Sequence, residues 1–531
     1  MTLKVATNGK TAIAVESVID QLVADKVASR IAAKDFTLWG KDAEAESSIR
    51  LGWTTSATES QALVAGILEL KSYFNGKGIN RFVLCGMGGS SLAPEVITKT
   101  AGVELVVLDS TNPEQVGHAL AGDLSKTAVI VSSKSGSTVE TDSQKRLFEQ
   151  AFTQAGIDKT DRIVIVTDPG SPMESAAKAD GYRIFNADPM VGGRYSALTA
   201  FGLVPSGLAG ADIQGLLKDA VSAMEILGSD DASNPGLVLG AVLARTANSS
   251  NFADKLALVE SGTSIKGLGD WAEQLIAEST GKLGRGVLPV VLENSAPELA
   301  SKPSDLIVAR LVADAVEANA DEVSVSGSLG AQFLLWEYAT VVASRLIGIN
   351  PFDQPDVESA KIAARGMLEN RAVELPAAFA ESGVEVRVKG IDLAGVTSVA
   401  AAIDALIAAG KIDSFVSIHA YLDRVDHPSA AKLRSLFASK SDRPTTFGWA
   451  PRFLHSTGQY HKGGPAQGLY VQIVSRASKD IAVPGRDFTL GELIASQAAG
   501  DAEVLAAHGR PVLTLTLSDV EAGLTLIANS F

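Results

Sequence analysis

The sequence is poor in cysteine and in net positive charge, and each shortage excludes a class of protein. Cys85 is the only cysteine among 531 residues, so the chain forms no internal disulfide and no zinc site built on two or more cysteines. Its 46 basic and 61 acidic side chains give a net charge of −15, which argues against a nucleic-acid partner because such a surface needs a basic stripe. No apolar run reaches the roughly 18 residues of a membrane helix, and the amino terminus lacks the apolar core of a signal peptide. We therefore expect a cytoplasmic protein that makes no contact with a membrane.

What the sequence has in abundance is short β-branched runs that alternate with helical patterns. This alternation is typical of α/β proteins with parallel sheets that helices cover on both faces. The runs predict strands in three sets: 81–85, 104–108, 128–132, 162–167 and 182–185; then 255–260, 286–291, 306–309 and 323–325; then 385–388, 414–420, 469–474 and 511–517. Helical spacing of apolar residues predicts helices over 14–33, 59–74, 235–248, 267–279 and 329–347.

These sets divide the chain into four parts. We predict a helical lead-in over 1–58, two parallel-sheet α/β sandwich domains over 59–215 and 216–370, and a smaller carboxyl-terminal α/β domain over 371–531. The fold class is α/β.

Two loops rich in glycine and serine each follow a predicted strand and precede a helix. The first contains Gly89 and Ser90, and the second contains Ser133, Lys134, Ser135 and Thr138. Backbone amides at a helix start, hydroxyl groups and a lysine favour a bound phosphate, and the first loop departs from the GxGxxG pattern of dinucleotide sites. The alternative for each loop is a tight turn whose serine or threonine caps the helix. Because both loops leave the same edge of one sheet, a sugar phosphate is the favoured ligand.

Three further segments carry charged side chains at positions where chemistry is possible. Arg194 follows a glycine turn, where its guanidinium could stabilise a developing oxyanion; the alternative is a surface ion pair. Glu278 ends a predicted helix, an unfavourable place for a carboxylate that has no other task. Lys361 lies three residues after Glu358, and the alternative for this spacing is a solvated ion pair.

In this order, the segments resemble the glucose-6-phosphate isomerase family, which is built from two sugar-isomerase (SIS) domains. The segments Gly-Gly-Arg-Tyr-Ser (192–196) and Phe-Asp-Gln-x-x-Val-Glu-x-x-Lys (352–361) match its two signatures. The carboxyl-terminal part, with Arg443-Pro-Thr-Thr-Phe-Gly and the glycine-rich stretch 455–465, resembles the extension of a bacterial branch whose isomerase is sometimes fused to a transaldolase. The resemblance implies interconversion of glucose 6-phosphate and fructose 6-phosphate through a cis-enediol, without cofactor or metal, by a homodimer.

The resemblance also implies a role for each candidate residue. Glu278 would be the base, Arg194 would stabilise the enediolate, and Lys361 would assist ring opening. Gln274 and Gln354 would contact the sugar, and the phosphate would bind to Gly89, Ser90, Ser133, Lys134, Ser135 and Thr138.

One departure from the family concerns the histidine that opens the sugar ring. The family has a Gly-Gln-His segment before the helix at 329–347, but this chain reads Gly330-Ala-Gln-Phe, and no histidine occurs between residues 119 and 418. The task then falls to Lys361, to Gln332 or Glu337, or to His455 or His461 of the extension, although both histidines could also be ordinary hydrogen-bonded loop residues. The missing histidine keeps open a sugar-phosphate-binding protein without catalysis, and a third alternative is a dual phosphoglucose/phosphomannose isomerase.

Overall fold

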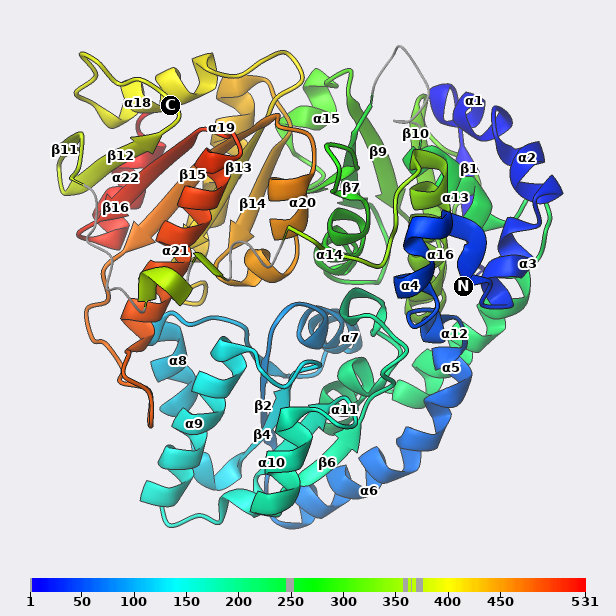
Figure 1. Ribbon diagram of the computed structural model, residues 1–531, viewed down its shortest axis with the longest axis horizontal. Coiled ribbons are helices and arrows are strands. Elements are labelled where there is room, and N and C mark those ends of the chain that lie inside the picture. The colour runs from blue at the N-terminus through cyan, green and yellow to red at the C-terminus, as the bar shows by residue number, and fades with distance from the viewer. Residues whose placement is uncertain (1, 245–252, 357–361, 364, 369–375) are drawn as a thin grey trace.

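The computed structural model describes residues 2–244, 253–356, 362–363, 365–368 and 376–531, and it contains three sheets (Figure 1). We call each sheet with its covering helices a unit. The first sheet has the order β3-β2-β4-β5-β6 and is parallel throughout. Its strands are β2 (Arg81–Gly86), β3 (Val106–Leu108), β4 (Thr127–Ser132), β5 (Ile163–Thr167) and β6 (Arg183–Asn186). The five strands predicted for this part of the chain are confirmed.

Helices cover both faces of the first sheet. They are α6 (Gln61–Gly76), α7 (Leu92–Ala101), α8 (Pro113–Leu120), α9 (Val139–Gln154), α10 (Pro172–Asp180) and α11 (Ala200–Ala209). Two of them begin at an Asx or serine cap followed by proline: the Asn112 side chain accepts from Gln115 N at 3.0 Å, and Ser171 accepts from Glu174 N at 3.0 Å. Proline suits the first turn because its missing N–H has no partner there in any helix.

The second sheet has the order β1-β10-β9-β7-β8. Its parallel strands β7 (Lys255–Glu260), β8 (Leu288–Leu292), β9 (Leu306–Leu311) and β10 (Glu322–Ser326) agree with the prediction. The edge strand β1 (Lys4–Thr7) runs antiparallel to β10 and was not predicted. Its four half-buried residues are too few for a period to stand out, and the pairing partner lies more than 300 residues away.

The lead-in and the second unit together contain ten α-helices among the described residues. They are α1 (Lys10–Glu16), α2 (Ile19–Ala24), α3 (Val27–Ala32), α4 (Glu44–Ser47), α5 (Ser56–Glu59), α12 (Ile213–Leu227), α13 (Pro235–Leu243), α14 (Leu268–Thr280), α15 (Pro297–Ser301) and α16 (Leu329–Ile347). As its apolar composition predicts, α16 is buried on almost every side. A single apolar cluster joins α16 to the lead-in and to the helices of the first unit, so these parts share one core.

The third sheet has the order β11-β12-β16-β15-β13-β14. Its strands are β11 (Phe379–Glu381), β12 (Val384–Lys389), β13 (Phe415–Tyr421), β14 (Thr445–Trp449), β15 (Gly468–Ser475) and β16 (Val512–Leu517), and its helices are α18 (Val399–Ala408), α19 (Leu433–Ser441), α20 (Gly458–Gly463), α21 (Leu490–Ala507) and α22 (Val520–Ala528). Four strands match the predicted ones, whereas β11 and β14 were missed. Strands β12 and β16 are antiparallel, and β16, β15, β13 and β14 are parallel.

The third unit has its own apolar core but also packs on the other two units (Figure 1). Phe415 and Tyr460 join a cluster with β7 and β8 of the second unit, and Val483 and Leu490 join the core of the first. The third unit therefore brings its segments 450–463 and 476–490 against the other units. The domain boundaries given above stay a prediction.

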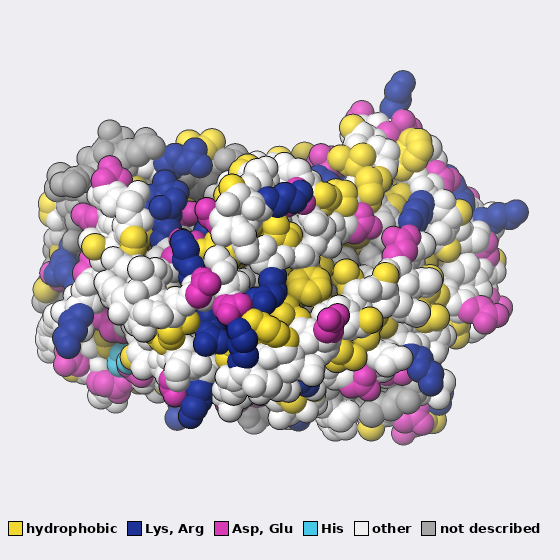
Figure 2. Space-filling view, turned by 90° about the horizontal axis from the view of Figure 1, so that it is seen from below, with side chains coloured by type: hydrophobic (Ala, Val, Ile, Leu, Met, Phe, Trp, Pro, Cys, Tyr) yellow, Lys and Arg dark blue, Asp and Glu magenta, His cyan; other side chains and the backbone are white. Residues whose placement is uncertain are grey.

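Two surface properties bear on possible partners. No helix of the described residues is both long enough and apolar enough to cross a bilayer. On the face shown in Figure 2, Lys and Arg side chains gather at the upper left and in the centre, with Asp and Glu side chains between and around them.

Candidate active site

The two glycine-serine loops leave neighbouring strands of the first sheet. Gly86 at the end of β2 pairs with Ser132 at the end of β4, so both loops start side by side. In the first loop, Gly89 lies directly against the backbone of the Gly-Gly-Arg turn: a Cβ at Gly89 would sit 2.0 Å from Gly193 O. Only glycine permits this approach, which brings the turn that carries Arg194 up to the first loop. Ser90 is buried, and the residue at the helix cap is Ser91, which makes no side-chain capping bond.

The second loop is closed by its own hydroxyl groups. Ser133 Oγ lies 3.1 Å from Thr138 Oγ1 and accepts from Gly136 N at 3.2 Å, and Ser135 Oγ accepts from Ser137 N at 3.3 Å. Lys134 forms an ion pair with Asp168, which follows β5. Burial lowers the pKa of Lys134 despite this partner. The loop thus gathers hydroxyl groups and an ammonium group at the start of α9.

Arg194 is buried and spans from the first unit to the second. Its NH1 donates to Gln354 Oε1 at 2.9 Å, and its NH2 donates to Pro351 O at 2.7 Å and Asp353 O at 3.0 Å. Its Nε donates to Ser279 Oγ at 3.0 Å. These contacts fix the guanidinium plane, so the surface ion pair considered as an alternative does not describe Arg194.

Glu278 faces that guanidinium from the last turn of α14. Its Oε2 lies 3.5 Å from Arg194 NH1 and accepts from Gln274 Nε2 at 3.2 Å. Burial raises the pKa of Glu278, and Arg194 and His455 offset only part of that rise. A carboxylate that is desolvated yet still faces a fixed cation is suited to take up and return a proton.

His455 reaches this group from the third unit. Its carbonyl oxygen accepts from Gln274 Nε2 at 2.7 Å, and its Nε2 lies 2.9 Å from Glu140 Oε1 at the start of α9. A Cβ at Gly88, whose φ is +55°, would sit 2.6 Å from the same carbonyl. The described site therefore joins Glu278, Arg194, Gln274, Gln354 and His455 with the first loop.

Sequence reasoning gave Lys282 no role, although it lies four residues after Glu278. Its buried ammonium donates to Asn350 O at 2.7 Å, Asp353 O at 2.6 Å and Asp353 Oδ1 at 2.7 Å. Arg194 binds the carbonyl of the same Asp353, so both cations hold the segment that carries Gln354. Burial, then Arg194, lower the pKa of Lys282 to about 8. The sequence shows a lysine four residues after Glu278, which could have suggested a role. Its partners lie about 70 residues further along the chain, so no local pattern reveals what it binds.

The remaining candidates for ring opening differ in their surroundings. His461 is buried in the third unit against His419 and Tyr470, and burial holds its pKa well below its ordinary range. Gln332 Oε1 accepts from Trp336 Nε1 at 3.0 Å on the same helix, and burial raises the pKa of Glu337 well above its ordinary range. Lys361, like Glu358, lies outside the described residues.

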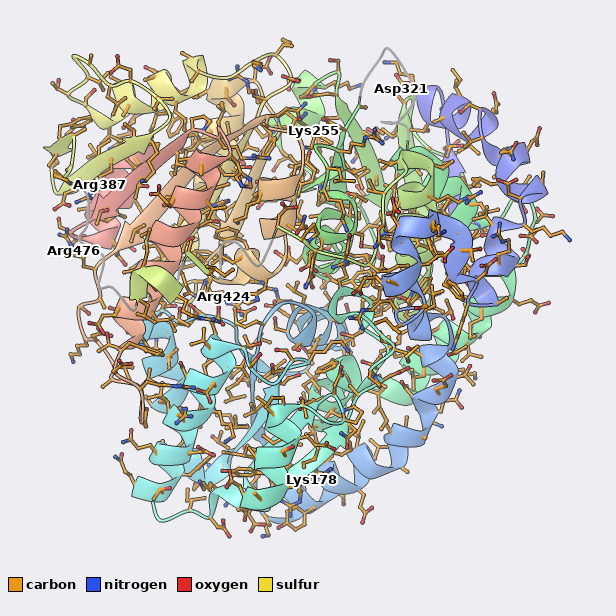
Figure 3. All side chains as sticks on the ribbon, in the orientation of Figure 1. Lys178, Lys255, Asp321, Arg387, Arg424 and Arg476 are labelled. Carbon is orange, nitrogen blue, oxygen red and sulfur yellow. The ribbon has the colours of Figure 1, made fainter. Side chains whose placement is uncertain are left out.

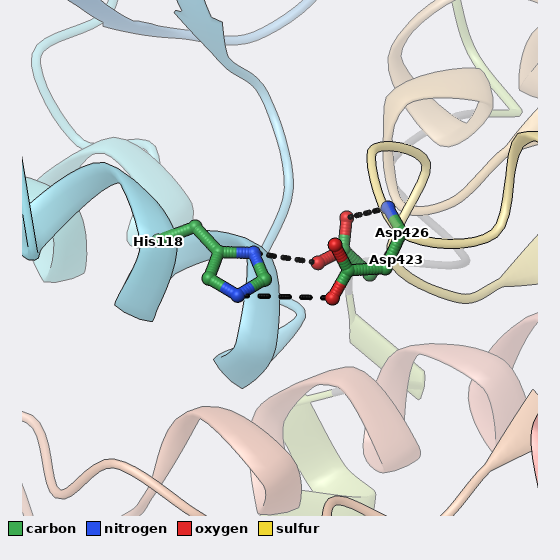
Figure 4. Close-up of side chains that lie close together, drawn as sticks. All are labelled: His118, Asp423 and Asp426. Carbon is green, nitrogen blue, oxygen red and sulfur yellow. Dashed lines mark hydrogen bonds and ion pairs between the residues drawn. The ribbon is translucent and has the colours of Figure 1, made fainter.

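One group of possible metal ligands lies at the boundary of the first and third units, formed by His118, Asp423 and Asp426 (Figure 4). The two ring nitrogens face different carboxylates: Nδ1 lies 3.3 Å from Asp423 Oδ2, and Nε2 lies 3.7 Å from Asp426 Oδ2. The ring thus bridges two carboxylates through its two nitrogens, whereas an imidazole ligates a given cation through a single nitrogen.

Comparisons with known proteins bear on the family of the chain. A family model described as phosphoglucose isomerase matches residues 59–284. A probable glucose-6-phosphate isomerase of Natronomonas pharaonis is 30% identical over 386 residues, which cover 63% of this chain and 89% of the relative. Another, of Haloarcula marismortui, is 34% identical over 211 residues, which cover 39% of this chain and 48% of that relative, or about half its length.

Solved structures show the same fold at low sequence identity. A hypothetical protein of Thermus thermophilus has a TM-score of 0.59 at 23% identity, with 69% of this chain and 100% of that one covered. A glucose-6-phosphate isomerase of Chlamydia trachomatis has a TM-score of 0.51 at 19% identity, with 62% and 75% covered. From the family match and the extent of the Natronomonas relative, the chain belongs to the glucose-6-phosphate isomerase family.

Proposed function

We propose that the protein interconverts glucose 6-phosphate and fructose 6-phosphate, with Glu278 as the base that moves a proton between C1 and C2. The observation that carries the proposal is the buried contact of Glu278 with Arg194, 3.5 Å apart, beside two loops suited to a phosphate. The names of the relatives favour this activity over the two alternatives raised from the sequence, a binding protein without catalysis and a dual isomerase.

Glu278 and Arg194 have complementary tasks in the proposed proton transfer. The Glu278 carboxylate takes the proton from C2 of the open-chain aldose, and the electron pair left behind forms the C1–C2 double bond of the enediolate. The negative charge then collects on O1, where a fixed guanidinium stabilises it, the task given to Arg194. Glu278 returns the proton to C1 while the proton of the C2 hydroxyl passes to O1, so that the C2 carbonyl forms and the ketose results. The sequence resemblance that suggested this chemistry implies neither cofactor nor metal.

The remaining residues bind the substrate. Hydroxyl and amide groups of the two loops would hold the phosphate, through Gly89, Ser90, Ser133, Lys134, Ser135 and Thr138. Gln274 and Gln354 would contact the sugar hydroxyls, because their amides already touch Glu278 and Arg194. Ring opening needs a proton carrier near the ring oxygen, and we assign this task to His455, with Lys361 as a second candidate. A homodimer remains part of the proposal.

The test is isomerisation of fructose 6-phosphate by the purified protein, with product detected through an NADP-linked glucose-6-phosphate dehydrogenase and a chelator present throughout. Wild-type protein should turn over, and Glu278→Gln should lower kcat by about 10²- to 10⁴-fold, the usual contribution of a general base. Calorimetry should still detect sugar-phosphate binding by the variant.

A matched control lies on the same helix. Glu273 also carries a carboxyl group whose pKa is raised by burial, to about 8, but the carboxylate that lies against Arg194 is that of Glu278. Glu273→Gln should therefore keep most of the activity. Binding without turnover by wild-type protein would contradict the proposal and support a sugar-phosphate-binding protein, and product formed from mannose 6-phosphate would support the dual isomerase.

A further inference from the structure

The turn that carries His455 is held at both ends by side chains of the other two units. This turn, η10 (Arg452–His455), follows β14 in the third unit. At its carboxyl end, His455 accepts from Gln274 of the second unit and faces Glu140 of the first. At its amino end, the Arg452 guanidinium forms an ion pair with Glu95 on α7 and lies 3.4 Å from Asp109 Oδ2, just after β3. The position of the turn thus depends on contacts with both other units.

The contacts at the amino end are buried and charged. Arg452, Glu95 and Asp109 are each at most 9% exposed. Burial alone would lower the pKa of Arg452, but Asp109 and Glu95 outweigh it and raise that pKa. Burial alone would raise the pKa of Glu95, but Arg452 and Arg424 hold it well below its ordinary range. The guanidinium and the Glu95 carboxylate therefore keep their charges throughout the neutral pH range.

A second arginine of the third unit reinforces the same contact. Arg424 NH1 lies 3.2 Å from Glu95 Oε1, and its NH2 donates to Val107 O at 3.0 Å (Figure 3, where Arg424 is labelled at the boundary of the units). A pair of arginines on one glutamate gives a rigid attachment, because each guanidinium offers several donors in a fixed plane.

We propose that Arg452 is a positioning residue, which fixes the η10 turn so that the third unit supplies His455 to the active site of its own chain. The inference rests on the proposed function. Arg452 forms ion pairs with Glu95 and Asp109, and Asp270 and Glu273 on α14 also face its charge, but we place none of these four residues in the reaction. The turn has little room to shift, because the His455 carbonyl packs against the backbone of Gly88.

The chain offers a matched control for this test. Arg434 on α19 is likewise buried, and it joins the third unit to the second through Glu298 on α15, at 2.6 Å. Helix α15 carries none of the proposed site residues. Arg452→Gln and Arg434→Gln therefore each remove a buried ion pair between units, but only the first touches the turn of His455.

The experiment compares kcat, KM and the pH profile of full-length variants, corrected for the folded fraction from circular dichroism. Arg452→Gln should lower kcat by about 10- to 100-fold, the usual effect of a small misplacement of a reacting group. KM for fructose 6-phosphate should change by less than about threefold, because the phosphate loops belong to the first unit. Arg434→Gln should keep kcat, and Arg452→Lys should recover part of the loss. The double variant Arg452→Gln/His455→Gln should be no slower than His455→Gln alone, because both changes act on one histidine.

Three results would overturn the inference: equal kcat in Arg452→Gln and Arg434→Gln, additive losses in the double variant, or a His455→Gln variant with normal kcat. If Arg452→Gln does not fold, Glu95→Gln weakens the same attachment from the opposite side and should lower kcat in the same direction. Absence of turnover in wild-type protein would instead contradict the proposed function, so the two failures are distinguishable.

Discussion

Burial moves the two ionisable side chains of the Glu278–Lys282 segment toward neutrality from opposite directions. It raises the pKa of Glu278 and lowers that of Lys282 to about 8, although each faces an opposite charge. A base with a raised pKa loses activity on acidification at a higher pH than an ordinary glutamate does. We therefore expect the acid limb of kcat/KM to lie above the usual carboxylate range and to disappear with Glu278→Gln.

The alkaline limb of the kcat/KM profile should reflect the loss of the proton from Lys282. Above about pH 8 the neutral amine no longer donates all three bonds that hold Asn350 and Asp353, so kcat/KM should fall by half near that pH. Lys282→Arg keeps its charge at higher pH and should move the limb upward by about one unit or more. A pH profile of both proteins checks this, and an unchanged limb in the variant would assign it to another group.

The contribution of Lys282 to the free energy of unfolding should rise over the pH range in which kcat/KM falls. The unfolded chain binds the Lys282 proton up to its ordinary pKa of 10.5, whereas the folded chain releases it near 8. Between these values the unfolded state binds more protons, so the contribution of Lys282 to the free energy of unfolding rises with pH. Loss of activity in this range is therefore expected without unfolding, which circular dichroism at each pH would reveal.

At the scale of turns, a substitution at Gly88 tests how closely the η10 turn of the third unit must approach the first loop. Gly88 has φ +55°, and an added Cβ would sit 2.6 Å from His455 O and 2.9 Å from Gln274 Nε2. Gly88→Ala should lower kcat/KM by about tenfold or more by displacing the η10 turn. Gly102 has a similar φ of +67° with open space around its Cβ, so Gly102→Ala bears the same backbone penalty without the clash and should keep its activity.

Within the third unit, the buried contacts of Asp501 on α21 should contribute strongly to the free energy of unfolding. Asp501 lies 2.7 Å from Lys462 Nζ and 3.3 Å from His419 Nδ1, and all three side chains are almost fully buried. Asp501→Asn leaves a buried ammonium without its counter-ion and should lower the free energy of unfolding by about 3–5 kcal/mol, measured by urea denaturation. The exposed pair Lys440–Asp404 is the comparison: Asp404→Asn should change stability little.

Strands and loops were predictable to the extent that their signal is local. Strands β2, β4 and β5 are short buried runs, and glycine and serine follow two of them directly, so the first sheet and its two loops could be predicted from the sequence. Strand β14 was missed because Thr445–Trp449 follows a proline and is only partly buried. The contact of His455 with Glu140 spans 315 residues, and no local pattern encodes such a pairing. Arg452 was missed for the same reason.

For the assembled chain, the main consequence is that five residues of the proposed site contact one another within one copy. Glu278, Gln274 and Gln354 come from the second unit and the segment after it, Arg194 from the first unit and His455 from the third, and hydrogen bonds and an ion pair connect all five. With His455 as the ring-opening residue, the third unit supplies part of the active site. A homodimer, which the resemblance to the family implies, would then stabilise the subunits without completing the described part of the site.

Dilution distinguishes a site that lies within one chain from a site that is shared between two subunits. If His455 serves its own chain, specific activity should stay constant from micromolar to nanomolar protein, even where analytical ultracentrifugation finds that dimers dissociate. A site that needed a histidine from a second subunit would lose activity in step with dissociation, because a shared site exists only in the assembled dimer. Mixing inactive Glu278→Gln with inactive His455→Gln protein gives a second measurement: subunits that each need both residues should not regain activity on exchange. Recovery toward a quarter of wild-type activity, the proportion of restored sites expected from random pairing, would show instead that histidines act across subunits.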